Sequence, residues 1–160
     1  MLQINNKASN SHPRAKMNLK QHLMATGAVS AVLLPFSDST GILLFACGSI
    51  LIDVDHQFFY YNKTGKCDVS GMFRYFREVI DKNLYSIPYI GICIFHTIEF
   101  VLLVALLSYY IPPLKYLLAG LIFHIVLDIY DLVRLKVPFV RAYSLVEHLV
   151  RRRQSGYPFV

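Results

Sequence analysis

The sequence predicts an all-α integral membrane protein with about four transmembrane helices and short amphipathic helices at the membrane interface. Two observations lead to this prediction. Of the 160 residues, 55% are hydrophobic and only 16% are charged, whereas a soluble domain typically carries about 25% charged residues. The hydrophobic residues are also gathered in four long stretches, and a membrane-spanning helix needs roughly 20 such residues.

The four apolar stretches account for the expected spans. They cover residues 23–36, 40–60, 86–111 and 114–131. The first stretch is short, and residues 17–22 can extend it as an interfacial turn. A link at residues 37–39 and a Pro-Pro pair at 112–113 join the stretches into two hairpins, because proline cannot continue a helix. A cleaved signal peptide is an alternative for the first stretch, but its end lacks small residues.

Lysine and arginine residues indicate the orientation of the spans. They gather before the first span, between the second and third, and after the fourth, whereas Lys115 is the only basic residue in or beside the two short links. An even number of spans places these three segments on one side, and their positive charge makes that side cytoplasmic. We therefore expect a flexible N-terminal segment (1–16), a transmembrane domain (17–140) with a cytoplasmic interfacial loop (61–85), and a basic cytoplasmic tail (141–160).

Several short segments outside or at the ends of the spans have interfacial patterns. Hydrophobic residues recur at helical spacing in residues 69–84 and more weakly in 143–153, which is typical of amphipathic surface helices. The aromatic run at 58–61 is typical of a membrane-interface belt. Cys47, Cys67 and Cys93 have no CxxC spacing, so we interpret all three as reduced and structural.

Ionisable residues inside the spans are the main functional signal. Five of the ten acidic residues and three of the six histidines lie there, and His22 stands at the start of the first span. A charge at the bilayer centre costs roughly 2.5–3.5 kcal/mol. Protonation, a wet cavity or a bound cation can offset this cost, and carboxylates mixed with neutral imidazoles suit a cation best. These residues are Asp53, Asp55, His56, His96, Glu99, His124, Asp128 and Asp131.

The spacing of these residues places several of them on shared faces. His124 and Asp128 are four residues apart and Asp53 and His56 are three apart, so each pair shares one side of a helix. Asp55 would point away from Asp53 in a continuous helix. We therefore expect the second helix to break here, which is tolerated at membrane depth where the backbone lines a polar cavity. Interhelical hydrogen bonding or a solvated cap could explain each motif alone, but not easily all of them.

The order of these motifs resembles that of the YdjM-type proteins of the bacterial inner membrane, a family interpreted as membrane-bound metal-dependent hydrolases. The matching segments are His22, residues 48–56, 95–99 and 120–128, and the pair Pro138 and Phe139. The chain departs from the family pattern at Ile52, where proline is usual, and in its central motif, which reads Phe-His-Thr rather than Thr-His-Ser. The arginine that usually precedes the central motif is absent.

The motifs and the resemblance together predict a metal-dependent hydrolase at the cytoplasmic face of the bacterial inner membrane, acting on a lipid ester or phosphoester. One or two divalent ions would be held by His22, Asp53, His56, His96, His124 and Asp128. This ligand set contains no thiol, which favours zinc, with manganese or magnesium as alternatives. Asp55 or Glu99 would act as general base or would orient a ligand.

Two other functions fit the same residues. Intramembrane acids and histidines also mark paths for protons or divalent ions, so the chain could be a non-enzymatic transport protein. It could also be a scaffold in which a structural metal holds the fold and the basic tail binds a cytoplasmic partner. In each case we expect membrane lipids as partners and no specific nucleic acid binding. Nothing in the sequence indicates a nucleotide loop or a flavin site.

Overall fold

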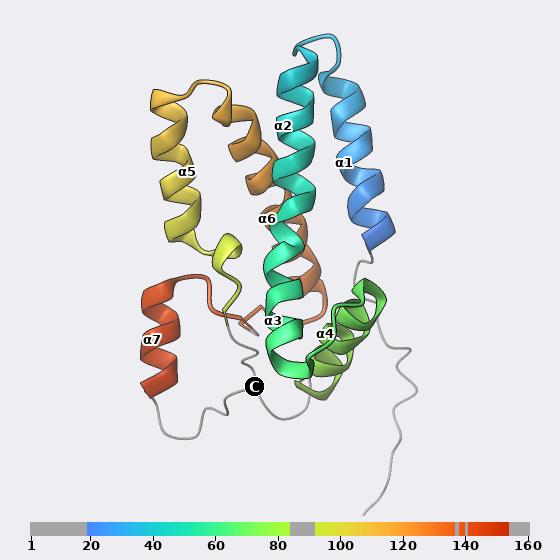
Figure 1. Ribbon diagram of the computed structural model, residues 1–160, viewed down its shortest axis with the longest axis vertical. Coiled ribbons are helices and arrows are strands. Elements are labelled where there is room, and N and C mark those ends of the chain that lie inside the picture. The colour runs from blue at the N-terminus through green and yellow to red at the C-terminus, as the bar shows by residue number, and fades with distance from the viewer. Residues whose placement is uncertain (1–18, 84–91, 137, 140, 154–160) are drawn as a thin grey trace, which may run out of the picture.

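The computed structural model describes residues 19–83, 92–136, 138–139 and 141–153, and within these ranges every element is helical (Figure 1). The elements are α1 (Leu19–Leu33), α2 (Ser39–Ile50), the 3-10 turn η1 (Leu51–Asp53), α3 (Val54–Thr64), α4 (Val69–Asn83), the 3-10 turn η2 (Ile94–His96), α5 (Ile98–Tyr110), α6 (Leu114–Arg134) and α7 (Leu145–Arg153). The predicted all-α fold class is confirmed. The predictions for residues 1–16 and 154–160 lie outside the described residues.

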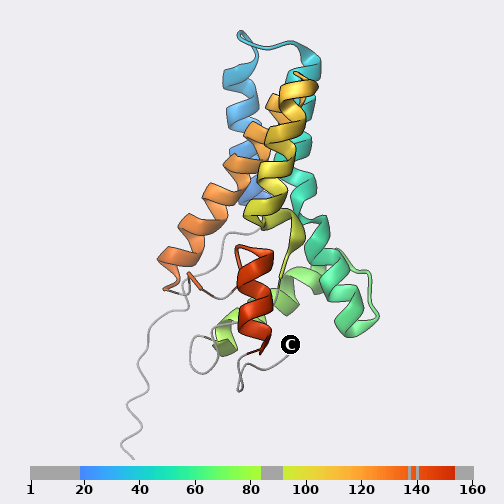
Figure 2. The same cartoon turned by 90° about the vertical axis from the view of Figure 1, so that its left-hand side faces the viewer.

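Four helices, α1, α2, α5 and α6, run side by side along the long axis of the molecule (Figure 1). The α1–α2 turn and the α5–α6 turn lie at one end, and α4 and α7 lie at the other end (Figure 1, Figure 2). Helix α6 packs against both α2 and α5, and α1 packs against α2. The arrangement is therefore two helical hairpins, joined through α6, with the two short amphipathic helices gathered at the end opposite the turns.

Local sequence explains both hairpin turns. Asp38 caps the first turn of α2, because its Oδ1 accepts a hydrogen bond from the Gly41 amide at 2.8 Å. Helix α5 ends at Tyr110, two residues before the Pro112–Pro113 pair, and α6 begins directly after that pair. Proline is tolerated at a helix start but not in its interior, so the pair ends one helix and begins the next.

Two helical stretches are long and apolar enough to cross a membrane by length and composition. They are Ser39–Thr64, which comprises α2, η1 and α3, and Leu114–Arg134, which is α6. Helices α1 and α5 have 15 and 13 residues, fewer than the roughly 20 that a spanning helix needs. The structure thus supports two candidate spans, and the count of four stays a prediction.

The third predicted span differs from the observed helix. The prediction placed a helix over residues 86–111, but α5 begins only at Ile98, and residues 84–91 lie outside the described part. Thr97 has extended backbone (φ −89°, ψ 151°), and its hydroxyl caps α5 by accepting from the Phe100 amide at 3.3 Å. Before this cap, Ile92 forms an isolated parallel bridge with Ala142. In residues 92–97 these contacts, together with η2, take the place of the expected helix.

The predicted break in the second helix is confirmed. Helix α2 ends at Ile50, and η1 follows before α3 begins at Val54. A 3-10 turn has 3.0 residues per turn rather than 3.6, so it rotates the faces of α3 relative to those of α2. As a result both Asp53 and Asp55 approach the same histidine, His96.

Helices α2 and α6 cross in close contact through two glycines. A Cβ atom on Gly48 would overlap the carbonyl oxygen of Leu117, and one on Gly120 would overlap the carbonyl oxygen of Phe45. Small residues of this kind let two helix backbones approach directly, as they commonly do in membrane helix pairs. The crossing sets the distance between η1, which follows α2, and the polar residues of α6.

Replacing Gly120 by alanine is expected to separate α2 from α6, because the obstructing atom belongs to backbone and cannot rotate away. We expect a loss of about 1–3 kcal/mol in the free energy of unfolding, measured by denaturant titration in detergent. Gly27→Ala in α1 is the matched control, since no atom lies within 4 Å of the position that a Cβ atom would take there. Equal stabilities for the two variants would contradict the close crossing.

Helix α4 is the observed form of the predicted amphipathic segment at 69–84, but it is packed rather than free on the surface. Its residues Met72 and Phe76 are buried against Tyr60 of α3 and against Leu132 and Leu135 at the end of α6. This cluster lies beside the polar residues that follow η1, so α4 covers them from the end of the molecule opposite the hairpin turns. Residue 84 lies outside the described part.

Candidate metal centre

Side chains from five elements meet where α2 passes into α3. They are His22 of α1, Asp53 of η1, Asp55 and His56 of α3, His96 of η2, and His124 and Asp128 of α6. All except Asp53 are buried. The structure therefore brings together the six side chains that the sequence suggested as metal ligands, together with Asp55.

Four atoms face one another at the middle of this cluster, and we call their residues the central group: Asp53, His96, His124 and Asp128. Asp53 Oδ1 lies 3.4 Å from His124 Nε2 and 3.9 Å from His96 Nε2. Asp128 Oδ2 lies 3.7 Å and 3.6 Å from the same two nitrogens. Asp53, His96 and His124 form one group that could hold a metal ion, and His22, His124 and Asp128 form a second group, which shares His124 with the first.

The protonation of both imidazoles follows from their other contacts. His124 Nδ1 lies 2.7 Å from the carbonyl oxygen of Ser49, and His96 Nδ1 lies 3.1 Å from Asp55 Oδ2. A carbonyl and a carboxylate only accept hydrogen bonds, so each Nδ1 carries a proton and donates it. Among the described residues neither Nε2 has a hydrogen-bond partner, although both are buried. In its neutral form each histidine therefore has its lone pair on Nε2, directed at the central group, as metal-bound histidines do.

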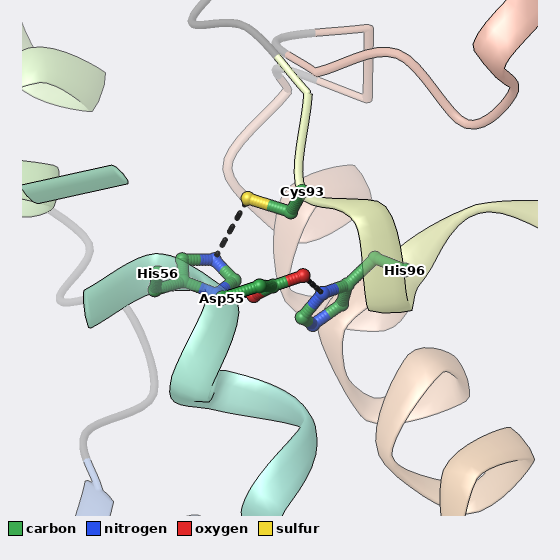
Figure 3. Close-up of side chains that lie close together, drawn as sticks. All are labelled: Asp55, His56, Cys93 and His96. Carbon is green, nitrogen blue, oxygen red and sulfur yellow. Dashed lines mark hydrogen bonds and ion pairs between the residues drawn. The ribbon is translucent and has the colours of Figure 1, made fainter. Parts of the chain in front are cut away.

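Asp55 holds two histidine rings from the side away from the central group. Its Oδ1 accepts from His56 Nδ1 at 2.8 Å, and its Oδ2 accepts from His96 Nδ1 at 3.1 Å and from the Phe95 amide at 2.9 Å. Figure 3 shows Asp55 between the two rings. Because both oxygens are engaged in this way, the geometry favours the orienting role for Asp55 over that of general base.

Cys93 lies closer to the cluster than the sequence suggested. All three cysteines are free, but Cys93 is buried and its Sγ lies 3.7 Å from His56 Nε2 (Figure 3). Asp55, His56, Cys93 and His96 form a further set whose ligand atoms lie within 4.8 Å of one another. In that set Asp55 and His96 Nδ1 already bond each other, which leaves His56 Nε2 and Cys93 Sγ to bind an ion. No spacing rule for thiol ligands would have identified this cysteine.

His22 brings α1 to the cluster. Its Nε2 lies 3.6 Å from Asp128 Oδ1, the carboxylate oxygen that does not face the central group, and its ring stacks on that of His124 with centroids 4.8 Å apart. Helix α1 is held to α2 nearby, where the hydroxyls of Thr26 and Ser49 hydrogen-bond at 2.7 Å. His22 thus supports Asp128 and His124, and it remains within reach of a second ion.

Arg141 belongs to the cluster, although the sequence assigned it to the C-terminal tail. Lys136, with φ 62°, adopts the left-handed conformation just after α6, where the chain leaves the helix. Arg141 Nη1 then donates to Asp128 Oδ2 at 2.9 Å. Burial opposes its charge, but the charge of Asp128 more than offsets this, and the pKa of Arg141 is raised. In the sequence, the only indication that Arg141 belongs to the site is its position two residues after Phe139, in the Pro138–Phe139 pair of the family pattern.

Glu99 makes its hydrogen bonds outside the cluster, and its role as a base stays a prediction. Its Oε1 accepts from the Ser144 hydroxyl at 2.6 Å and from the Leu145 amide at 3.0 Å. The carboxylate therefore sits at the N-terminus of α7, where the helix dipole favours a negative charge. The extended backbone at Thr97 separates Glu99 from His96, so the two residues do not share the helical face that their spacing suggested.

A small pocket opens beside the central group and has one polar and one apolar wall. The polar wall comprises His22, Asp53, His56 and Asp128, and the apolar wall comprises Met72, Phe73 and Phe76 of α4. The ring of Phe76 also meets the edge of His56 with centroids 4.8 Å apart. Access to the candidate metal ligands thus passes along the apolar face of α4.

Comparison of the chain with protein-family models, with curated proteins and with solved structures found no match. The resemblance to the YdjM-type proteins therefore stays a prediction from the order of the motifs.

Proposed function

We propose that the chain is a membrane-embedded, metal-dependent hydrolase whose centre is held by Asp53, His96, His124 and Asp128. The observation behind the proposal is the pair of buried Nε2 lone pairs that face two carboxylate oxygens at 3.4–3.9 Å. A buried polar atom without a hydrogen bond costs about 1–3 kcal/mol, and two such atoms aimed at one volume are explained by an ion. The motif order of the sequence favours the same function.

Zinc is the ion that these ligands fit best. Bonds of about 2.0–2.1 Å in a tetrahedron place neighbouring ligand atoms about 3.3–3.4 Å apart, close to the distances within the central group. Imidazole suits zinc well, whereas magnesium prefers oxygen ligands and retains several waters. Asp55 would fix the proton of His96 on Nδ1, and Ser49 would do so for His124, so both residues present Nε2 to the ion.

A divalent ion in this position lowers the pKa of a bound water and polarises a substrate carbonyl or phosphoryl oxygen. The residues of the chain would provide the remaining functions. His56 lines the pocket 3.5 Å from Asp53 and is held through Nδ1 by Asp55. Its Nε2, which lies 3.7 Å from Cys93 Sγ, is the ring nitrogen that remains to take up or give a proton during the reaction. Asp55 would position this histidine rather than act on the substrate itself.

The membrane setting rests on the two candidate spans and on exposed apolar side chains. Outward-facing large hydrophobic residues cover α5 and α6, and include Leu102, Leu103, Leu106, Ile122, Val126 and Ile129. A continuous apolar surface of this kind is rare on soluble proteins. We propose four spans in the bacterial inner membrane, with both termini, α4 and α7 on the cytoplasmic side. The two-walled pocket would then admit an amphiphile, with its polar head at the ion and its chains along α4.

The hydrolase proposal is tested by loading the detergent-solubilised protein with zinc and incubating it with an inner-membrane lipid extract. We expect release of phosphate, a headgroup or a fatty acid, detected by mass spectrometry, and no release with His124→Ala. His148→Ala, an equal truncation on α7, should keep the activity. If the zinc-loaded wild type converts no lipid in the extract, the lipid hydrolase proposal fails and the structural role of the metal takes its place.

A further inference from the structure

The guanidinium group of Arg141 is buried with more donors than partners. The side chain is 6% exposed, and among the described residues its hydrogen-bond partner is Asp128, whose Oδ2 accepts from Nη1 at 2.9 Å. Within the part of the chain that the structure describes, Nε and Nη2 are buried without a hydrogen-bond partner. Leaving buried donors of a charged group unsatisfied is costly. An acceptor from outside these residues would remove that cost.

The position of this guanidinium relates it directly to the central group. The oxygen that accepts from Arg141 is the same Asp128 Oδ2 that faces His96 Nε2 and His124 Nε2. Through this shared oxygen the guanidinium of Arg141 lies next to the proposed position of the ion, on the Asp128 side, although Arg141 does not line the pocket beside α4. Arg141 thus lies beside the site where the ion would bind, but it is not itself a ligand of the ion.

The segment around Arg141 is held firmly against η2 and α5. Ala142 forms the bridge with Ile92, and the carbonyl oxygen of Tyr143 accepts from the Ile98 amide at 2.9 Å. The ring of Tyr143 lies 5.7 Å from the guanidinium carbon, within cation–π distance. The fork of Arg141 is therefore oriented before any ligand arrives, which reduces the entropy lost on binding.

Charge indicates which ligand would enter. The cluster contains three carboxylates, Asp53, Asp55 and Asp128, and its imidazoles are neutral where Nε2 binds an ion. With three carboxylates and neutral imidazoles, one divalent ion would leave the centre with one net negative charge, which repels anions. The positive charge of Arg141 cancels this negative charge. A carboxylic ester is neutral when it binds and develops an oxyanion only in the transition state. A phosphate group carries its negative charge on binding, and a guanidinium fork matches its oxygens in both charge and spacing.

We propose that Arg141 binds the phosphoryl oxygens of the substrate through Nε and Nη2, and that the substrate is a phosphoester. This inference rests on the proposed metal centre. Hydrolysis needs only water: its hydroxyl joins phosphorus, the P–O bond to the leaving group breaks, and the leaving oxygen takes the proton. Phosphate is the recognised group, whether a free phosphate compound or a lipid headgroup carries it.

The test measures phosphate binding and metal content on the same samples of zinc-loaded, full-length protein in detergent. Wild type should bind inorganic phosphate, and Arg141→Gln should bind it about 10- to 100-fold more weakly while keeping its zinc. Arg152→Gln, which removes an exposed arginine of α7, should bind phosphate like wild type. Equal binding by wild type and Arg141→Gln, or no phosphate binding by zinc-bearing wild type, would overturn the inference and leave the metal centre standing.

A second variant covers the case in which Arg141→Gln loses the metal by exposing Asp128. Arg141→Lys keeps the charge but not the fork, so it should retain zinc and still bind phosphate more weakly. Loss of zinc in this variant too would make Arg141 a positioning residue of the metal site and overturn the inference. If wild type itself holds no zinc, the proposed function fails and the inference falls with it.

The same measurement distinguishes the two sources of phosphate. Mixed micelles that contain phosphatidic acid should compete with inorganic phosphate in wild type, whereas diacylglycerol micelles should not. Stronger competition by phosphatidic acid than by a soluble phosphomonoester would identify a lipid headgroup as the ligand. The reverse order would identify a soluble phosphate compound, and either result supports Arg141 as the binding residue. Competition that is unchanged in Arg141→Gln would contradict it.

Discussion

Replacing His124 by alanine is expected to reduce bound zinc from about one ion per chain to near zero. Loss of a residue that only orients a ligand weakens metal binding by about 10- to 100-fold, and loss of a ligand should weaken it at least as much. His124 contributes its Nε2 to the central group, and no other described nitrogen lies beside both Asp53 Oδ1 and Asp128 Oδ2 except that of His96. Elemental analysis of detergent-purified protein measures the effect.

His148→Ala is the control for this experiment, because it makes the same chemical change on α7, outside the cluster. It should keep the zinc content of wild type. His124→Ala should also unfold more easily, since truncation leaves two carboxylates near each other in a buried site. Retention of full zinc content in His124→Ala would show that the central group is not the binding site.

Replacing Asp55 by asparagine should also weaken metal binding, by about 10- to 100-fold. The carboxylate accepts hydrogen bonds from His56 Nδ1 and His96 Nδ1 at once, whereas asparagine has one oxygen that accepts and an NH₂ group that can only donate. One of the two histidines must then accept a hydrogen bond from this NH₂ group at Nδ1, and its own ring proton must lie on Nε2. For His96 that proton would occupy the position of the ion. Titration with a competing chelator measures the affinity.

Glu99→Gln is the matched control for Asp55→Asn, since it also replaces a carboxylate by its amide. Glu99 contacts Ser144 and Leu145 rather than the cluster, so its variant should bind zinc like wild type. The opposite result for Asp55 is informative as well. Unchanged zinc affinity with turnover lowered by about 10²–10⁴ would make Asp55 the general base.

The sequence was sufficient to predict which side chains would meet, because ionisable residues in apolar stretches require partners. The break before Val54 also followed from a local argument, since Asp53 and Asp55 could not otherwise face the same site. The exact ligand atoms did not follow from the sequence. They depend on which ring nitrogen of His96 and of His124 is already bonded, and that is set by Asp55 and by the Ser49 carbonyl.

Two residues of the site depended on long-range structure. Arg141 reaches Asp128 only because the chain returns after α6 and residue 142 pairs with residue 92. Charge counting grouped Arg141 with the basic residues of the tail, from which only its position two residues after Phe139 distinguishes it. For Glu99 the sequence suggested a contact that the structure does not have. Its spacing from His96 predicts a shared helical face, but Thr97 between them is extended, so the two residues do not lie on one continuous helix. Helical periodicity predicts neighbours only within a continuous helix.

The most direct test of the metal centre is X-ray absorption spectroscopy of the zinc-loaded protein in detergent. The central group predicts four nitrogen or oxygen ligands at about 2.0–2.1 Å, with the outer-shell scattering of two imidazoles and no sulfur. A sulfur ligand at about 2.3 Å would instead place the ion between His56 and Cys93. That result would contradict the assignment of the centre to Asp53, His96, His124 and Asp128.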